Sequence, residues 1–254
     1  MAESLLNSLE LPLDELFPGE LQQEKPPTAI GLANGIPLWV KYYFKRTLMS
    51  GVHFEHQLYG PDNTYLQSIF SPARRFAIIP QALLRRVIKQ GRVKDLNVST
   101  GSTGGIHWGR TSGWSAVGKT FPDFFAVKVF PTPESEPRKH YVVCVVEVKL
   151  AEAAAGDVER VNTAEMQMFG YMKTLINHPY RVKQLKGYLL VGTKYLEYQI
   201  NEETKDVDYV PGQYKNMFAA GDPLTIALCD IAVQEWNRTS ENAPNIWPDL
   251  EFDD

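Results

Sequence analysis

Three charged side chains stand at the ends of two apolar runs near the middle of the chain. Asp123 follows Pro122 at the start of the run FPDFFAVKVF, and Glu147 and Lys149 lie at the end of the run YVVCVVEVKL. Side chains two positions apart on a strand project from the same face, so Glu147 and Lys149 point the same way. If the two runs pair as an antiparallel hairpin, the start of the first lies beside the end of the second. The sequence therefore predicts a cluster of two carboxylates and one ammonium.

Such a cluster suits the hydrolysis of phosphodiester bonds with the help of a divalent metal. Two adjacent carboxylates repel each other unless a cation lies between them. Oxygen ligands favour Mg²⁺ or Mn²⁺, and an incomplete set of protein ligands leaves room for phosphate oxygens. A neighbouring lysine can position or help to deprotonate the attacking water and can offset negative charge on the phosphate. The expected cofactor is therefore Mg²⁺, or Mn²⁺ in its place.

A third feature follows downstream, in the segment TAEMQMFGYMKTLI. Gln167 and Tyr171 are four residues apart, so they lie on one face of a helix. Together with the Pro-Asp pair at Asp123 and the Glu-Val-Lys triplet that ends at Lys149, this ordered set resembles the PD-(D/E)XK, or restriction-endonuclease-like, nuclease superfamily. The Q-x-x-x-Y element is similar to that of its RecB-like branch. In that family Gln167 and Tyr171 would contact the substrate or order the site, and the resemblance covers roughly residues 101–200.

The resemblance implies both a fold and an activity. The implied fold is α/β, of the α+β type: a mixed central sheet flanked by helices, in a single domain with an N-terminal helical addition. Asp123, Glu147 and Lys149 would be the catalytic residues. The metal would bind to Asp123, to Glu147 and to the backbone carbonyl of Val148. The expected protein is a divalent-metal-dependent nuclease that hydrolyses phosphodiester bonds of nucleic acid, DNA in preference to RNA.

One part of the family pattern is absent from the place where we expect it. The superfamily often has a further metal-binding glutamate on its first helix. The helix expected there, Gln81–Gln90, starts after Pro80 and stops at Gly91, and it contains no acid. Glu55 is the nearest upstream acid apart from Asp62, and we treat Glu55 as a candidate metal ligand.

Two other functions stay open. The missing glutamate and the acidic ends of the chain favour, as an alternative, a catalytically inactive module of the same fold that binds nucleic acid or protein. Residues Gly113–Thr120 also match the phosphate-binding loop G-x-x-x-x-G-K-[ST], in which Lys119 would serve a nucleotide hydrolase. That loop needs a buried strand before it and a helix that begins at its lysine. The glycine-rich context and the following Pro122 argue against both.

Charge is distributed unevenly along the chain. Residues 1–25 and 241–254 each carry a net charge of −5, so residues 26–240 carry +6 within the total of −4. Residues 63–94 contain seven bases and no acid. The positive net charge of residues 26–240 favours a polyanionic partner such as nucleic acid. A solvated helix face whose charge is balanced by the acidic ends of the chain would have the same composition.

Length and composition allow one large domain. The chain has 254 residues and is 44% hydrophobic, and we expect the nuclease-like domain over 28–240, between an acidic N-terminal arm (1–27) and an acidic tail (241–254). No apolar run approaches the roughly 18 residues that cross a bilayer, and the N-terminus lacks the features of a secretory signal. Cys144 and Cys229 lie in apolar settings and not in a disulfide framework. We therefore expect an intracellular protein, cytoplasmic or nuclear, with no membrane partner.

The remaining elements follow from turn residues and apolar spacing. Pro37 and Gly51 bracket an expected helix whose core candidates are Trp39, Tyr43 and Leu48. Four further segments have clear patterns: a turn at Gly60–Asn63, a strand over 183–192, a hairpin over 194–212, and a last helix from Asp222 through Trp236.

Overall fold

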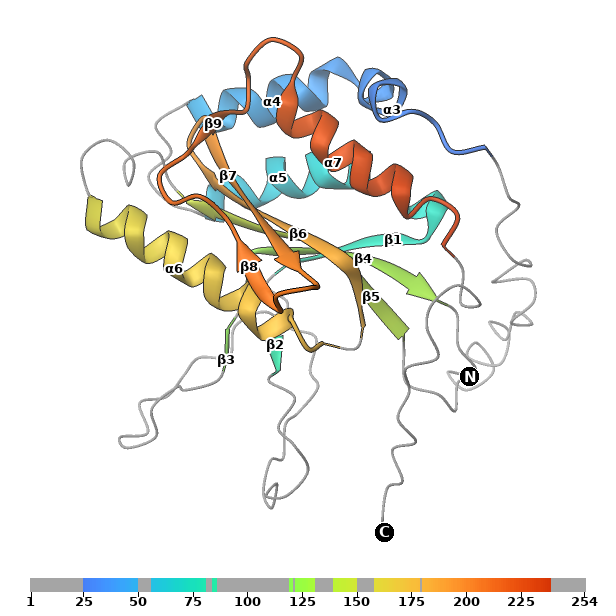
Figure 1. The fold of residues 1–254 in the computed structure, drawn as a ribbon. Helices are drawn as coiled ribbons and strands as arrows, with labels where there is room; N and C mark the ends of the chain where they lie inside the picture. The colour runs from blue at the N-terminus through green and yellow to red at the C-terminus, as the bar shows by residue number, and fades with distance from the viewer. Residues whose placement is uncertain are drawn as a thin grey trace, which may run out of the picture.

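The structure is a computed structural model, and it shows a main sheet with helices on both faces (Figure 1). The described residues are 25–49, 56–80, 84–85, 119–120, 122–130, 139–149, 158–178 and 180–238. Within them, no helix is long and apolar enough to cross a membrane. Apart from residues 25–27, the expected N-terminal arm lies outside the described residues, as does the whole acidic tail.

The main sheet is mixed and mostly antiparallel. Its strands are β1 (Phe76–Pro80), β4 (Phe124–Phe130), β5 (Lys139–Lys149), β6 (Arg181–Val191), β7 (Lys194–Asn201), β8 (Asp206–Asp208) and β9 (Lys215–Asn216). The strand order is β1-β4-β5-β6-β7-β8, with β9 also beside β7. Only β5 and β6 pair in parallel among these strands. A separate two-stranded sheet joins β2 (Leu84–Arg85) to β3 (Lys119–Thr120).

Helices cover both faces of the main sheet. They are α3 (Ala29–Gly35), α4 (Leu38–Met49), α5 (His56–Ile69), α6 (Val158–Leu175) and α7 (Pro223–Gln234), with a short 3₁₀ helix, η1 (Pro72–Arg74), before β1. In Figure 1, α6 lies on one face of the sheet, and α4, α5 and α7 lie on the other. Helix α6 also makes the crossover between the parallel strands β5 and β6, a connection that parallel strands require. The structure thus confirms the expected mixed α/β class with a helix-flanked sheet.

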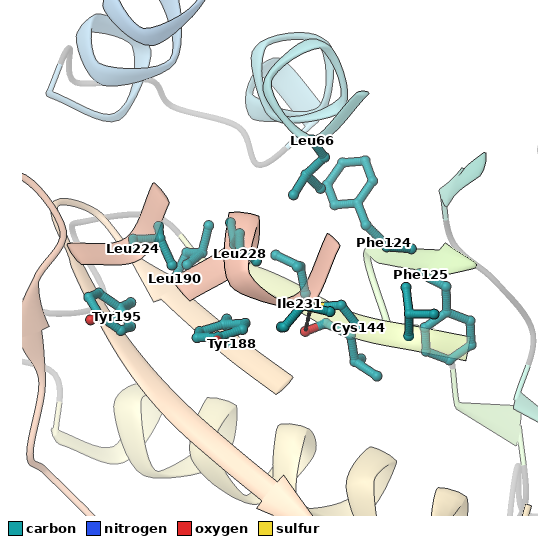
Figure 2. Close-up of a cluster of buried hydrophobic side chains, with 14 of the residues drawn as sticks. Leu66, Phe124, Phe125, Cys144, Tyr188, Leu190, Tyr195, Leu224, Leu228 and Ile231 are labelled. Atoms are coloured by element: carbon teal, nitrogen blue, oxygen red, sulfur yellow. Dashed lines mark hydrogen bonds between the residues drawn. The ribbon is translucent and has the colours of Figure 1, made fainter. Parts of the chain in front are cut away.

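The core lies on both sides of the central strands. In β5 the run from Val142 to Val146 is at most 5% exposed, as expected for a strand covered on both faces. Figure 2 shows Leu228 and Ile231 of α7 above Tyr188 of β6. On the opposite face, β6 approaches α6 closely at a glycine. A Cβ atom at Gly187 would overlap the end of the Met168 side chain.

The central prediction about this sheet is confirmed. The two apolar runs form the antiparallel pair β4 and β5, and the register sets Phe124 opposite Val146. The strand expected over 183–192 is β6, the hairpin is β7 and β8, and the last helix is α7. Cys144 and Cys229 are free and buried.

Two predicted elements are wrong. The turn expected at Gly60–Asn63 lies inside helix α5, which contains Pro61. Leu58 and Tyr65 of this helix are no more than 2% exposed, and burial of such an apolar face outweighs the one backbone hydrogen bond that proline removes. The helix expected over Gln81–Gln90 is contradicted at its described residues, Leu84–Arg85, because their backbone pairs with β3.

The core face of α4 also differs from the prediction. Trp39 and Tyr43 are 63% and 46% exposed, while Val40, Phe44 and Leu48 are at most 4% exposed. The buried residues recur every four positions and form one stripe along the helix. Phe44 stacks on Tyr65 of α5 with ring centroids 4.0 Å apart. Because α4 is apolar on most of its circumference, its sequence does not specify which stripe faces the core.

Candidate active site

The candidate site lies where β4 begins and β5 ends. The backbone N–H of Asp123 donates to Glu147 Oε2 at 3.1 Å, and the backbone N–H of Val148 donates to Asp123 Oδ2 at 2.7 Å. The antiparallel pairing of the two strands creates this contact, since it sets the start of β4 against the end of β5. Asp123 and Glu147 are therefore neighbours, as the sequence predicted.

Lys149 completes the predicted cluster. Its Nζ lies 2.9 Å from Glu147 Oε1, and its side chain is 17% exposed. This contact confirms that positions 147 and 149 project from one face of the strand. Glu147 is only 1% exposed and Asp123 is 6% exposed, so Lys149 is the most accessible of the three side chains.

The electrostatic balance of the cluster is negative. Burial raises the pKa of Glu147 to about 7, and the charge of Asp123 contributes to the rise, while the ammonium of Lys149 acts in the opposite direction. One ammonium thus does not fully compensate two adjacent carboxylates in this buried setting. The arrangement favours a further cation.

Helix α5 adds two residues that the sequence alone did not identify as part of the site. The hydroxyl of Tyr59 donates to Asp123 Oδ1 at 2.6 Å. Asp62 is three residues further along, on the same side of the helix, and is 1% exposed. Burial raises the pKa of Asp62 well above its usual range, and the charge of Asp123 adds to this effect. Both carboxylate oxygens of Asp62 lack a hydrogen-bond partner among the described residues.

A signal for Asp62 was present in the sequence. It is an acid in α5, the last α-helix before the first strand of the sheet. Gly60, Pro61 and Asn63 surround it and are typical of a turn. These residues concealed the helix, so the sequence indicated Glu55 and not Asp62 as the candidate ligand.

Helix α6 brings Gln167 and Tyr171 together. The Gln167 amide donates to the Tyr171 hydroxyl, as their spacing on one helix face predicted. Burial raises the pKa of Tyr171 to about 12, and the charge of Glu147 contributes to the rise. Tyr171 therefore lies within electrostatic reach of the carboxylates and stays protonated at neutral pH.

Other predicted site residues are placed differently or lie outside the described residues. Val148 contributes its backbone N–H to Asp123, and metal binding by its carbonyl stays a prediction. Glu55 lies outside the described residues. So does the stretch 113–118 of the possible phosphate-binding loop. Lys119 and Thr120 form strand β3, whereas that loop requires a helix to begin at its lysine.

The residues present fit a hard divalent cation by their chemistry. In the described part of the chain, no three carboxylate, imidazole or thiolate groups already converge as a metal centre. Asp62, Asp123 and Glu147 nevertheless supply the oxygen donors that Mg²⁺ and Mn²⁺ prefer. A buried carboxylate without a partner is costly unless a cation or a proton neutralises it. The raised pKa of Asp62 favours neutralisation by a proton, and a cation close to Asp123 would neutralise it in the same way.

Comparisons with known proteins found no matching family model, no similar curated protein and no similar solved structure. The functional interpretation therefore depends on the geometry of this site and on the order of its residues along the chain.

Proposed function

We propose that this protein is a divalent-metal-dependent nuclease with a restriction-endonuclease-like fold, which hydrolyses phosphodiester bonds of nucleic acid, DNA in preference to RNA. The observation that carries the proposal is the cluster at the ends of β4 and β5. There the backbone of Asp123 lies 3.1 Å from the Glu147 carboxylate, and Lys149 Nζ lies 2.9 Å from the same carboxylate.

The order of the residues along the chain supports the same proposal. An acid on a helix, Asp62, comes first, and Asp123 follows at the start of a strand. Glu147 and Lys149 then come at the end of the next strand, before a helix that carries Gln167. This order is the one that the resemblance to the PD-(D/E)XK superfamily implies. Asp62 takes the place of the first-helix acid.

Each residue of the cluster would have its own role in the reaction. A divalent metal would supply Lewis-acid stabilisation of the charge that develops on the phosphate, and Asp62, Asp123 and Glu147 would hold it. Lys149 is the partly exposed cation of the cluster, so it can orient the attacking water and offset negative charge on the substrate. Tyr59 restrains the Asp123 carboxylate through its 2.6 Å hydrogen bond.

A cleavage assay tests the proposal. The full chain would be incubated with labelled single-stranded and double-stranded DNA and RNA, in Mg²⁺, in Mn²⁺ or in EDTA. We expect metal-dependent cleavage that falls by about 100-fold or more in Asp123→Asn and in Lys149→Met, since each change removes a charge from the reacting centre. Lys186→Met is the matched control, because Lys186 also pairs with a glutamate on the sheet, at 3.0 Å from Glu197, outside the cluster. Undiminished cleavage in Lys149→Met, or cleavage in EDTA, would contradict the mechanism.

A second candidate is a catalytically inactive module of the same fold that binds nucleic acid or protein. Both oxygens of Asp123 already accept hydrogen bonds, from Tyr59 and from Val148, which favours a site that is stable without a metal. Calorimetry with Mn²⁺ separates the two functions. The inactive module predicts no heat of binding and an affinity for nucleic acid that Asp123→Asn leaves unchanged.

A further inference from the structure

The outer face of α4 is aromatic and exposed. Trp39 and Tyr42 are each 63% exposed, and Tyr43 is 46% exposed. The opposite side of the helix packs into the core through Val40 and Phe44, each 3% exposed. The exposure of the three aromatic rings is therefore fixed by how the helix packs, and it is a stable feature of this surface.

The same face is basic. Helix α4 has the sequence LWVKYYFKRTLM, with three bases and no acid. Lys45 and Arg46 are exposed and follow Tyr42 by three and four positions, so both lie beside its ring on the helix surface. We refer to Trp39, Tyr42, Tyr43, Lys45 and Arg46 together as the α4 surface.

A groove of about 320 Å³ runs along one side of this surface. Its walls are formed by α4, including Tyr42 and Lys45, and by the segment around Phe218, with Tyr65 among the residues between them. Lys45 Nζ lies 4.8 Å from the centre of the Phe218 ring. Aromatic and cationic groups thus line the helix face, and the groove beside it is mostly apolar, with Lys45 and the Lys41–Asp222 ion pair among its lining residues.

We propose that the α4 surface and the adjoining groove bind a single strand of nucleic acid. Unpaired bases stack on exposed aromatic rings, and phosphates are attracted to the lysine and arginine side chains between those rings. In a duplex the bases are already stacked on one another, so the aromatic rings would find few partners there. This inference deepens the proposed nuclease function and rests on it, because it names an unpaired strand as the substrate form.

Two other occupants fit the surface less well. A twofold contact centred on this surface would bring Lys45 and Arg46 of one copy towards the same two cations of the other, and such like-charge contacts are unfavourable. A helix that lies on a membrane separates its apolar face from its charged face. On α4, by contrast, Lys45 and Arg46 flank Tyr42 on one face.

Binding measurements in EDTA test the inference without cleavage. Fluorescence anisotropy would follow a labelled oligothymidine and a blunt duplex of equal length, over a range of salt concentrations. We expect tighter binding of the single strand. Tyr42→Ser/Tyr43→Ser should weaken that binding by about 30-fold or more, because two stacked bases are lost and each contributes at least about 1 kcal/mol. Lys45→Gln/Arg46→Gln should reduce the slope of log affinity against log salt by about 1.4, at about 0.7 for each phosphate contact in a single strand.

The matched control removes two exposed lysines elsewhere on the sheet, in Lys183→Gln/Lys194→Gln, and should change neither affinity nor slope. The inference is overturned if the tyrosine variant binds the single strand as tightly as the wild type, or if the duplex binds equally well. It is also overturned if neither probe binds, or if vesicles rich in phosphatidylserine bind through the same residues instead. A protein that binds single strands through α4 but cuts no substrate would contradict only the proposed nuclease function.

Discussion

Asp123 donates its backbone N–H to the Glu147 carboxylate over 3.1 Å, although the two residues are 24 positions apart in the chain. A second bond runs the other way, from the backbone N–H of Val148 to Asp123 Oδ2 at 2.7 Å. Both donors belong to the backbone and both acceptors are buried carboxylates. The two bonds fix the start of β4 against the end of β5, so the same carboxylates that could bind a metal also hold the strands together.

This double role predicts different stabilities for two substitutions of Asp123. In Asp123→Ala, the buried Val148 N–H loses the Asp123 carboxylate as its acceptor, and a buried unpaired donor costs about 1–3 kcal/mol. In Asp123→Asn, the side-chain oxygen can still accept from Val148, so the loss should stay below about 1 kcal/mol. Urea denaturation in EDTA measures both free energies of unfolding. Equal losses in the two variants would show that the bonds contribute little to stability.

Asp62→Asn should stabilise the protein in the absence of metal. The wild-type carboxyl group is buried with no partner among the described residues, and replacing it by a neutral amide of the same shape removes about 1 kcal/mol or more of unfavourable free energy. Mn²⁺ should raise the melting temperature of the wild type but not of the variant. Asp208→Asn, at an exposed site, is the control for a lost negative charge. A wild type that melts higher than Asp62→Asn in EDTA would contradict the prediction.

The part of the site on the hairpin could be predicted from sequence because it depends on short-range geometry. Alternation along a strand sets Glu147 and Lys149 on one face, and a short connection makes the two runs antiparallel neighbours. The spacing of Gln167 and Tyr171 likewise requires only the pitch of a helix. None of these relationships depends on how distant elements pack.

The contribution of α5 was missed because the formation of this helix depends on tertiary packing. Gly60, Pro61 and Asn63 locally favour a turn, and only the burial of Leu58 and Tyr65 against the rest of the protein favours the helix. The exposed aromatic residues of α4 were missed for a related reason. Residue type indicated a core position for Trp39, but the packing of Phe44 on Tyr65 decides which face is buried.

Two glycine substitutions should change stability in opposite directions. Gly187 faces α6, and a Cβ there would overlap Met168 Cε and lie 2.8 Å from Met172 Sδ. Gly187→Ala should therefore cost about 1–3 kcal/mol, as overpacking does in a filled core. Gly170 lies within α6 with no atom within 4 Å of an added Cβ, so Gly170→Ala should stabilise the protein by about 0.5–1 kcal/mol through helix propensity. Denaturant midpoints measure both, and a stabilising Gly187→Ala would show that the two methionines repack without cost.

Gly187→Ala should reduce the rate of cleavage by more than its loss of stability alone would cause. The two methionines that the new methyl group would displace belong to α6, the helix that carries Gln167 and Tyr171. A shift of this helix moves Tyr171 away from the carboxylates, and small misplacements of site residues reduce rate by up to about 100-fold. Cleavage assays well below the melting temperature of the variant separate this effect from unfolding. Activity equal to that of Gly170→Ala would contradict it.

Lys128 should make stability depend on pH in the alkaline range. It is 0% exposed, and its Nζ donates to the carbonyl of Trp236 at 3.0 Å. Burial lowers its pKa from the usual 10.5 to about 8; Glu235 opposes this change, while three nearby arginines add to it: Arg74, Arg75 and Arg238.

Between the folded and unfolded pKa values of Lys128, the unfolded chain binds more protons than the folded protein. Stability therefore rises with pH in this window and the gain is lost as the pH falls through about 8. Between about pH 7 and about pH 10, the free energy of unfolding of the wild type should rise by about 1–3 kcal/mol relative to that of Lys128→Met. A tenfold change in proton affinity corresponds to about 1.4 kcal/mol. Urea denaturation of both proteins at each pH measures this difference, and the variant cancels the titration of all other groups. A difference that stays constant with pH would show that Lys128 keeps its ordinary pKa in the folded protein.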